Sequence, residues 1–139
     1  MTVSNARGIR NNNPGNIRWC DQWRGLVPES QRTDKDFCQF VSPEYGIRAM
    51  MIILTHYQTQ HALNTISGII HRWAPPEEND TQAYIDSVST VTGIPAHQHI
   101  DLMDGNTRLK LIRAIIVHEN GCQPYDAAVL KRAEELADE

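Results

Sequence analysis

The sequence predicts a mainly α-helical (α+β) fold in which helices follow a small N-terminal β-hairpin or loop region. Apolar residues recur at helical spacing after residue 42, whereas residues 1–40 lack this period. Hydrophobic residues make up 40% of the 139-residue chain, which is enough for a core at this length. We therefore expect residues 1–139 to form one domain.

The first forty residues have the composition of turns and short extended segments. The stretch NNNPGN at 11–16 is dense in turn-forming residues, and residues 19–40 alternate short apolar and polar pieces, as in a small hairpin. Cys20 and Cys38 flank these pieces. Their thiols stay reduced in a cytosolic protein, whereas an oxidising compartment would allow a bridge between them.

Five helices are expected in the remainder of the chain. Residues that favour helix starts precede several of them, namely Ser42, Thr65 and either Asn79 or Asp80. The fourth helix is the most apolar, so we expect it at the centre of the fold. The expected helices cover residues 43–60, 66–74, 81–92, 107–119 and 124–139.

Composition argues against several classes of function. The net charge of -4 is unlike that of nucleic-acid-binding domains, and the longest uncharged apolar stretch, at 49–54, is too short to span a membrane. The first 13 residues lack the apolar segment of a signal peptide, so we expect synthesis in the bacterial cytoplasm without one. His97 and His99 form a pair without a nearby carboxylate or cysteine cluster, which favours a loop over a metal site.

Glu119 occupies an unfavourable place for an acid. It follows Ile112, Ile115 and Ile116 by seven, four and three residues, which puts it on the apolar face of its helix. It also lies in the last turn, where the helix dipole disfavours negative charge. Both effects favour the protonated carboxyl, which can protonate a leaving group in glycoside hydrolysis. The alternative is a partly exposed glutamate beside a helix cap at Gly121.

The stretch AIIVHENGCQPYDA resembles the catalytic helix of lysozyme-like lytic transglycosylases, in which an apolar run leads to Glu-Ser-Gly and then to Asn-Pro-Tyr-Ala. Glu119, Gly121, Pro124 and Tyr125 match this pattern, and Asn120 stands where the family has serine. The resemblance implies that Glu119 is the general acid. His118 points about 100° away from it around the helix, so we do not expect His118 to be its partner.

A second stretch, RWAPPEENDTQAYIDSV, resembles the start of another helix in that family, Glu-Thr-x-x-Tyr-Val. Asp80, Thr81, Tyr84 and Ile85 stand at the corresponding positions. The resemblance implies that Tyr84 approaches the catalytic acid and that Thr81 is a substrate-binding residue. The alternative for Tyr84 is a core aromatic residue whose buried hydroxyl needs some partner.

A third stretch, NNNPGNIR, resembles the Asn-Leu-Phe-Gly-Ile turn of related glucosaminidases. This resemblance implies that Asn13 and Asn16 bind acetamido sugars. The alternative is that both serve the turn, because asparagine tolerates left-handed backbone. As in those enzymes, a Trp-x-Gly and a phenylalanine-rich piece follow, here at Trp23, Gly25, Phe37 and Phe40.

The three matches occur in an altered order. In the family the catalytic helix precedes the tyrosine helix, whereas here the turn comes first, then Tyr84, then Glu119. A circular permutation of a lysozyme-like core accounts for this order. It predicts that residues 11–18 and Tyr84 surround the C-terminal end of the 107–119 helix. As a whole, the chain resembles small phage or prophage proteins that open with RGIRNNNPGNIR and are linked to virions or host lysis.

Glycoside hydrolysis normally uses a second carboxylate. Glu29, Asp34 and Asp36 lie in the hairpin-like stretch where several lysozyme-like enzymes keep theirs, and we favour Asp34. The alternative is that PESQRTDKD is a solvated charged loop. Glu119 would then act alone as acid and base, as in lytic transglycosylases.

The resemblance implies cleavage of the β-1,4 bond between N-acetylmuramic acid and N-acetylglucosamine by a muramidase or lytic transglycosylase that needs no metal or other cofactor. The expected partners are peptidoglycan glycan strands, with virion proteins or an inhibitor protein as further candidates and no nucleic acid. The expected protein is a monomer without stable membrane insertion. It would reach the periplasmic cell wall from the virion, during phage lysis or by secretion. The competing expectation is a non-enzymatic virion or interaction protein that keeps this fold.

Overall fold

Six α-helices and one short 3-10 helix form the regular structure of residues 6–139, the part of the chain that the computed structural model describes. A mainly α-helical fold is thereby confirmed. Residues 1–5, on which the expected absence of a signal peptide partly rests, lie outside the described residues. The helices are α1 (Arg7–Arg10), η1 (Glu29–Gln31), α2 (Pro43–His61), α3 (Ile66–Trp73), α4 (Thr81–Thr92), α5 (Gly105–Asn120) and α6 (Ala127–Ala137).

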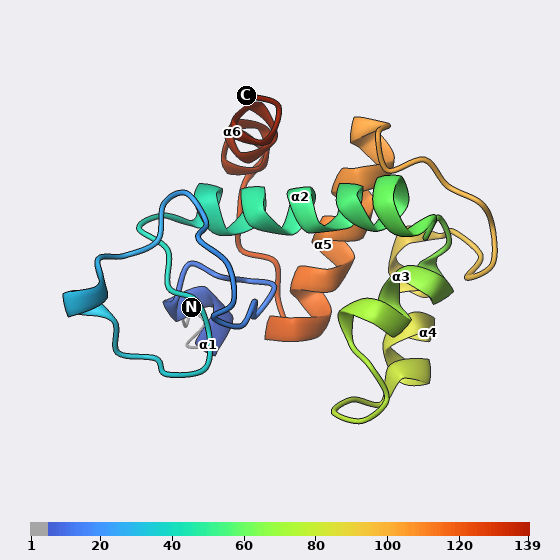
Figure 1. Ribbon diagram of the computed structural model, residues 1–139. Coiled ribbons are helices and arrows are strands. Elements are labelled where there is room, and N and C mark those ends of the chain that lie inside the picture. The colour runs from blue at the N-terminus through green and yellow to red at the C-terminus, as the bar shows by residue number, and fades with distance from the viewer. Residues whose placement is uncertain (1–5) are drawn as a thin grey trace.

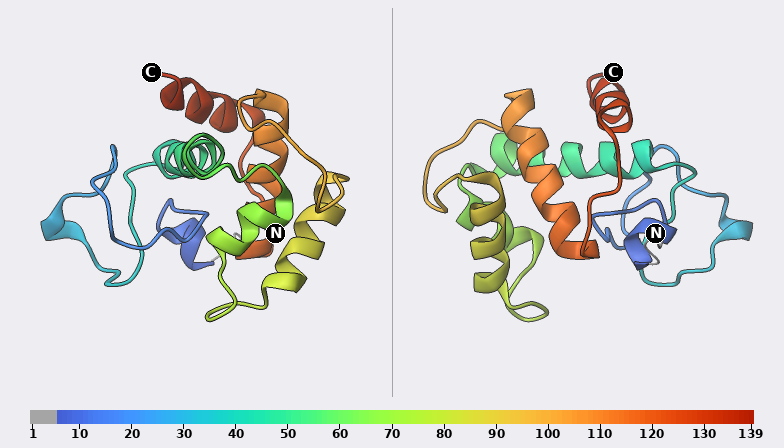
Figure 2. Two further views of the ribbon diagram at one scale, coloured as in Figure 1. Left: turned by 45° about the vertical axis from the view of Figure 1, so that its right-hand side comes forward. Right: turned by 180° about the vertical axis from the view of Figure 1, so that it is seen from behind.

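Helix α2 divides the molecule into two sides (Figure 1). Helix α6 packs along one side of α2, and α5 crosses α2 and continues to the other side. There the N-terminal segment and the α3–α4 pair lie on either side of the C-terminal end of α5, as the right-hand view of Figure 2 also shows. The core lies between these helices and includes Ile47, Leu54, Ile70, Ile112 and Ile115, each with no exposed surface. The C-terminal end of α5 is therefore the point where three parts of the chain meet.

Two helices begin directly after the residues that the sequence predicts as N-caps, and in both the capping side chain accepts a hydrogen bond from the first turn. Thr65 accepts a hydrogen bond from the Gly68 N–H at 3.1 Å, and Asp80 accepts one from Ala83 at 3.1 Å. Ser42 stands at the N-cap position of α2, as expected, but its side chain makes no capping bond.

Two helices begin elsewhere than expected. Helix α5 starts two residues before Thr107, because Asp104 caps it, and α6 starts at Ala127, because Asp126 caps it. A cap fixes a start by satisfying an otherwise unpaired N–H in the first turn. The preceding Pro124 therefore belongs to the connector and not to the helix.

The expected hairpin is a loop region with isolated bridges. Within residues 6–139 its pairing consists of two isolated antiparallel bridges, Arg18 with Phe37 and Leu26 with Phe40. Cys38 donates its N–H to the Ile17 carbonyl at 2.8 Å, and burial raises the pKa of its thiol to about 11. Cys20 is exposed, and both thiols are free, so the bridge expected for an oxidising compartment is absent here.

The part of the chain from residue 6 onward contains no helix that is both long and apolar enough to cross a bilayer.

The N-terminal turn packs directly on the first turns of α2. A methyl group added at Gly46 would collide with the backbone carbonyl of Asn12. Glycine costs a helix about 1 kcal/mol relative to alanine, so its presence inside α2 is explained by this close approach.

Gly46→Ala should therefore destabilise the protein by about 2 kcal/mol or more, because backbone cannot move aside as a flexible side chain can. Gly68→Ala in α3 is the matched control, since its added methyl meets side-chain atoms at 3.3 and 3.4 Å. Urea unfolding of both variants measures the difference. A Gly46→Ala protein as stable as wild type would contradict the close packing of turn and helix.

Candidate functional site

Glu119 lies one residue before the end of α5. Its helix ends at Asn120, and Gly121 follows with a φ of 78° and donates its N–H to the Val117 carbonyl at 2.7 Å. This left-handed glycine cap is the one expected from the sequence. Ile115 and Ile116, on the same face of the helix, are fully buried, and Glu119 itself is half-buried.

Both carboxylate oxygens of Glu119 accept a hydrogen bond. The Tyr84 hydroxyl donates to one oxygen at 2.7 Å, and the Asn16 side-chain amide donates to the other at 2.8 Å. The prediction that residues 11–18 and Tyr84 surround the end of α5 is thereby confirmed. Tyr84 comes from α4 and Asn16 from the N-terminal turn, so the bonds join residues 35 and 103 positions away from Glu119.

The Tyr84 hydroxyl is held in a protected environment. The side chain is 1% exposed, and burial, followed by the charge of Glu119, raises the pKa of Tyr84 well above its ordinary value. A hydrogen bond with Trp73 acts in the opposite direction. The exposed imidazole of His118 stacks on the Tyr84 ring, with ring centroids 3.7 Å apart and an interplanar angle of 27°. His118 therefore contacts the residue that binds Glu119, a role that its position on the helix did not suggest.

Asn13 fixes the shape of the N-terminal turn. It is fully buried, its amide donates to the carbonyls of Ile17 and Cys38 at 2.9 and 3.0 Å, and its side-chain oxygen accepts the Ile17 N–H at 3.0 Å. These bonds involve both the N–H groups and the oxygen of the Asn13 amide, so the side chain holds the turn together. Asn16 has a φ of 51°, the left-handed conformation that asparagine tolerates, and this aims its amide at Glu119.

Asn120 fastens α5 to the same turn. Its amide donates to the Pro14 carbonyl at 2.8 Å and to the Ile116 carbonyl at 3.0 Å. Its side-chain oxygen and that of Asn16 are buried without a hydrogen-bond partner. A methyl group added at Gly8 would lie 2.5 Å from the Asn120 oxygen and 3.1 Å from the Asn16 oxygen. Gly8 thus leaves room for both amides, which explains a glycine in the short helix α1.

A cavity of about 330 Å³ opens beside Glu119. Three aromatic side chains line it, namely Phe37, Tyr57 and Trp73. Arg18 and Glu78 also line it and form an ion pair at 3.6 Å, with 58% and 60% of their side chains exposed. The remaining lining residues are Gly15, Asn16, Ile17, Ile53, Ala74 and Asn79. Concave sites in which several polar groups converge commonly bind small molecules, and polar surface makes up the larger part of this lining.

Thr81 does not line this cavity. It is 5% exposed, and its hydroxyl donates to the Ala74 carbonyl at 2.6 Å. The bond ties the start of α4 to the residue that follows α3. Thr81 therefore positions the helix that carries Tyr84, and it contributes no group to the cavity.

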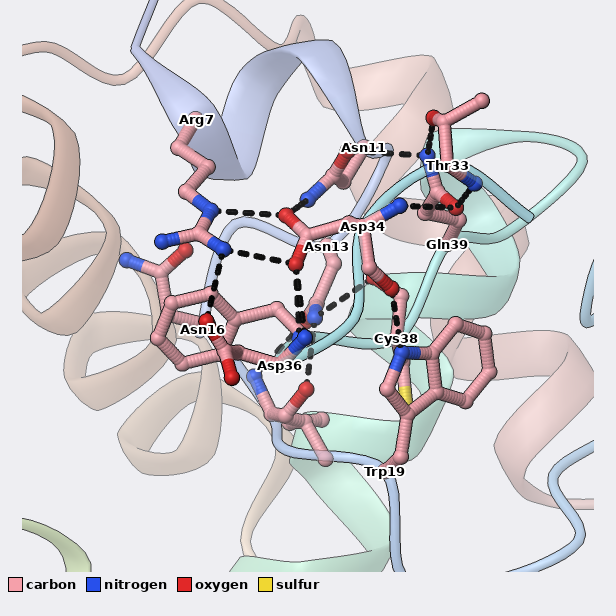
Figure 3. A network of polar contacts seen from close by, with 12 residues as sticks. Arg7, Asn11, Asn13, Asn16, Trp19, Thr33, Asp34, Asp36, Cys38 and Gln39 are labelled. Carbon is pink, nitrogen blue, oxygen red and sulfur yellow. Dashed lines mark hydrogen bonds and ion pairs between the residues drawn. The ribbon is translucent and has the colours of Figure 1, made fainter.

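Asp34 lies in a separate network within the loop region (Figure 3). Its carboxylate accepts bonds from Arg7 at 2.6 and 2.7 Å, from the Asn11 amide at 2.8 Å and from the N–H groups of Asp36 and Phe37 at 3.0 and 2.9 Å. The Asp34 side chain is 8% exposed and is not among the residues that line the Glu119 cavity. Its role as a second carboxylate thus gains no support from its position, and its contacts are those of a residue that organises the loop.

These contacts make stability depend on the charge of Asp34. The Arg7 guanidinium, followed by the N–H of Phe37 and the amide of Asn11, lowers the pKa of Asp34 well below its ordinary value of 3.8. Because the pKa of Asp34 is lower in the folded protein than in the unfolded chain, the ionised carboxylate stabilises the fold. This stabilisation is complete above the ordinary value of 3.8 and is lost as the pH falls below it.

Asp34→Asn should therefore destabilise the protein by about 2 kcal/mol at neutral pH, because a charged acceptor of several bonds is replaced by a neutral one. The difference from wild type should shrink as the pH falls below about 4. Asp36→Asn, whose side chain is 46% exposed and contacts Arg7 at 3.3 Å, is the control and should unfold like wild type. Urea unfolding at several pH values tests this, and an equal stability of the Asp34 and Asp36 variants at neutral pH would refute it.

The histidine, cysteine, aspartate and glutamate side chains of the described residues do not gather into a metal site. No group of three or more histidine, cysteine, aspartate or glutamate side chains in residues 6–139 is arranged to hold a metal ion. His99 of the His97–His99 pair contacts the Asn64 amide at 3.0 Å.

Comparison with known proteins finds similarity to a phage protein. No family model matches it. The chain is 43% identical over 131 residues to protein P5 of Pseudoalteromonas phage PM2, and this match spans 91% of the chain and 79% of that phage protein. Identity of this extent over most of both proteins establishes common descent. The chain therefore belongs to the family of protein P5 of phage PM2.

Proposed function

We propose that this protein cleaves the β-1,4 bond between N-acetylmuramic acid and N-acetylglucosamine in peptidoglycan, with Glu119 as the general acid. Its fold would be a circularly permuted lysozyme-like core. It would act on the periplasmic cell wall in phage lysis or penetration. The observation that carries the proposal is the Glu119 carboxyl, held by Tyr84 and Asn16 at the wall of an aromatic-lined cavity.

The hydrogen bonds to Glu119 leave positions on its carboxyl oxygens unused. A carboxyl oxygen offers two acceptor positions, and each oxygen of Glu119 accepts one bond from the protein. A proton can therefore sit on a free position that faces the cavity. Burial keeps Tyr84 protonated, because it raises the pKa of the hydroxyl, so Tyr84 remains a donor to Glu119 at neutral pH.

The reaction would begin at the oxygen that links the two sugars. Glu119 would donate its proton to O4 of the departing N-acetylglucosamine as the C1–O4 bond breaks and its electron pair stays on O4. Positive charge would then develop at C1 of the N-acetylmuramic acid. The hydrogen bonds from Tyr84 and Asn16 would stabilise the Glu119 carboxylate that remains after proton transfer.

The walls of the cavity suit a sugar. Tyr57 and Trp73 bring aromatic surface to the cavity, against which the C–H faces of sugar rings can lie, and Asn79 and Arg18 offer polar groups there. No metal enters this proposal, because a carboxylic acid supplies the proton directly.

Glu119→Gln should abolish cleavage of cell walls while the fold remains. The glutamine oxygen can accept the bond from Asn16, and its amide can donate to the Tyr84 oxygen, so shape and contacts persist while the transferable proton is lost. Stability should hold or rise, because an acid at a helix C-terminus opposes the helix dipole. The assay is loss of turbidity of outer-membrane-permeabilised cells, with thermal melts of both proteins alongside. If the wild type is active and the folded Glu119→Gln protein is equally active, the assignment of Glu119 is wrong. If the wild type is inactive, the result favours a non-enzymatic virion or interaction protein.

Tyr84→Phe should lower the rate on the order of tenfold or more, because it removes one of the two donors to Glu119. The matched control is Tyr125→Phe, since the Tyr125 hydroxyl is buried without a hydrogen-bond partner. Initial rates on purified cell walls compare the two variants. If both retain the wild-type rate, Tyr84 serves packing alone.

A further inference from the structure

The cavity that holds Glu119 contains a second carboxylate that the sequence did not single out. Among the residues that line it, the acidic ones are Glu119 and Glu78. Glu78 comes from the turn between α3 and α4, so it approaches the cavity from an element different from that of Glu119. The inference below rests on the proposed function, because a second carboxylate matters only if the glycan is cleaved in this cavity.

The turn that carries Glu78 is held at several points. The Glu78 N–H donates to the Pro75 carbonyl at 3.1 Å, and the Asn79 amide donates to the same carbonyl at 3.2 Å. Immediately after the turn, Asp80 caps α4, and Thr81 bonds back to Ala74. These bonds close the turn on itself and join its two ends, which fixes where the Glu78 side chain begins.

Glu78 and Asp34 each pair with an arginine, but the Glu78 carboxylate is far more exposed than that of Asp34. Arg18 lies 3.6 Å from the Glu78 carboxylate, both side chains are more than half exposed, and such pairs contribute little to stability. A polar ligand can therefore replace this contact at low cost. Asp34, in contrast, is 8% exposed and receives five hydrogen bonds from the protein, so its carboxylate has no free side to offer.

We infer that Glu78 is the general base of a hydrolytic reaction, and that it activates a water molecule against the sugar held at Glu119. A solvent-exposed carboxylate is supplied with water directly, which suits a base better than a nucleophile that must touch the sugar carbon. Carboxyl pairs that leave room for a water between acid and base are the arrangement of inverting glycosidases.

In the proposed step, one bond forms at C1 as another breaks, and each carboxyl group handles one proton. Glu78 takes a proton from water as the water oxygen bonds to C1 from the face opposite the leaving group. The C1–O4 bond breaks, and O4 receives the proton of Glu119. Glu78 ends protonated and Glu119 ionised, and exchange of both protons with solvent restores the starting state.

The test uses the full-length protein on purified peptidoglycan. Glu78→Gln should lower the initial rate on the order of a hundredfold, the size of effect typical for loss of a catalytic base. Glu77→Gln is the matched control, because Glu77 is the exposed neighbouring glutamate and does not line the cavity. Thermal melts of both variants should match wild type.

Two further readouts separate chemistry from a structural role. Sodium azide should restore turnover of Glu78→Ala and yield a glycosyl azide, which mass spectrometry detects, because azide takes the place of the activated water. The wild-type product, followed by proton NMR from the first minutes, should carry a reducing end of α configuration.

Loss of rate in Glu78→Gln together with azide rescue of Glu78→Ala is the expected result. A Glu78→Gln protein with the wild-type rate, or wild-type products that end in anhydro sugars, would overturn the assignment of Glu78 and leave the role of Glu119 intact. A wild-type protein that releases no glycan would overturn the proposed function and this inference with it.

Discussion

The pair of hydrogen bonds to the Glu119 carboxylate is the constraint on which the rest of the site depends. Tyr84 and Asn16 reach this carboxylate from α4 and from the N-terminal turn, at 2.7 and 2.8 Å. Segments that are far apart in the chain must therefore meet at the C-terminal end of α5. The cavity forms where they meet, because its lining residues come from the N-terminal region, α2, α3, the α3–α4 turn and α5.

Much of the N-terminal region serves to place Asn16. Buried Asn13 closes the turn, and Asn120 fastens that turn to the last residue of α5. Gly8 and Gly46 allow the turn to approach α5 and α2 more closely than any side chain would permit. A dense run of asparagine and glycine thus acts mainly as a rigid support, and one amide of the run reaches the carboxylate.

Patterns local to a helix could be predicted from the sequence, and so could one long-range contact. The apolar period and the caps at Thr65 and Asp80 predict α3 and α4, and the family resemblance predicts the contact between Tyr84 and Glu119. Thr81 was expected at the substrate but bonds to Ala74, because the first turn of α4 faces α3.

The sequence of the charged loop does not predict the environment of Asp34. PESQRTDKD has the pattern of a solvated loop, yet the Asp34 side chain is only 8% exposed, because Arg7, 27 residues earlier, folds back on it. Glu78 and Trp73 carry no local signal for a cavity, since only the packing of α3 on α4 and of α4 on α5 brings them near Glu119. Residues of this kind can be identified only from tertiary contacts, because their spacing along the chain does not indicate which cavity they line.

Mass spectrometry of material released from purified, protein-free peptidoglycan tests the central claim most directly. The account predicts soluble muropeptides whose glycan chains have been cut between N-acetylmuramic acid and N-acetylglucosamine, released by the wild-type protein at neutral pH. Release of peptides without sugar, or no release at all, would contradict the claim that the Glu119 cavity cleaves glycan strands.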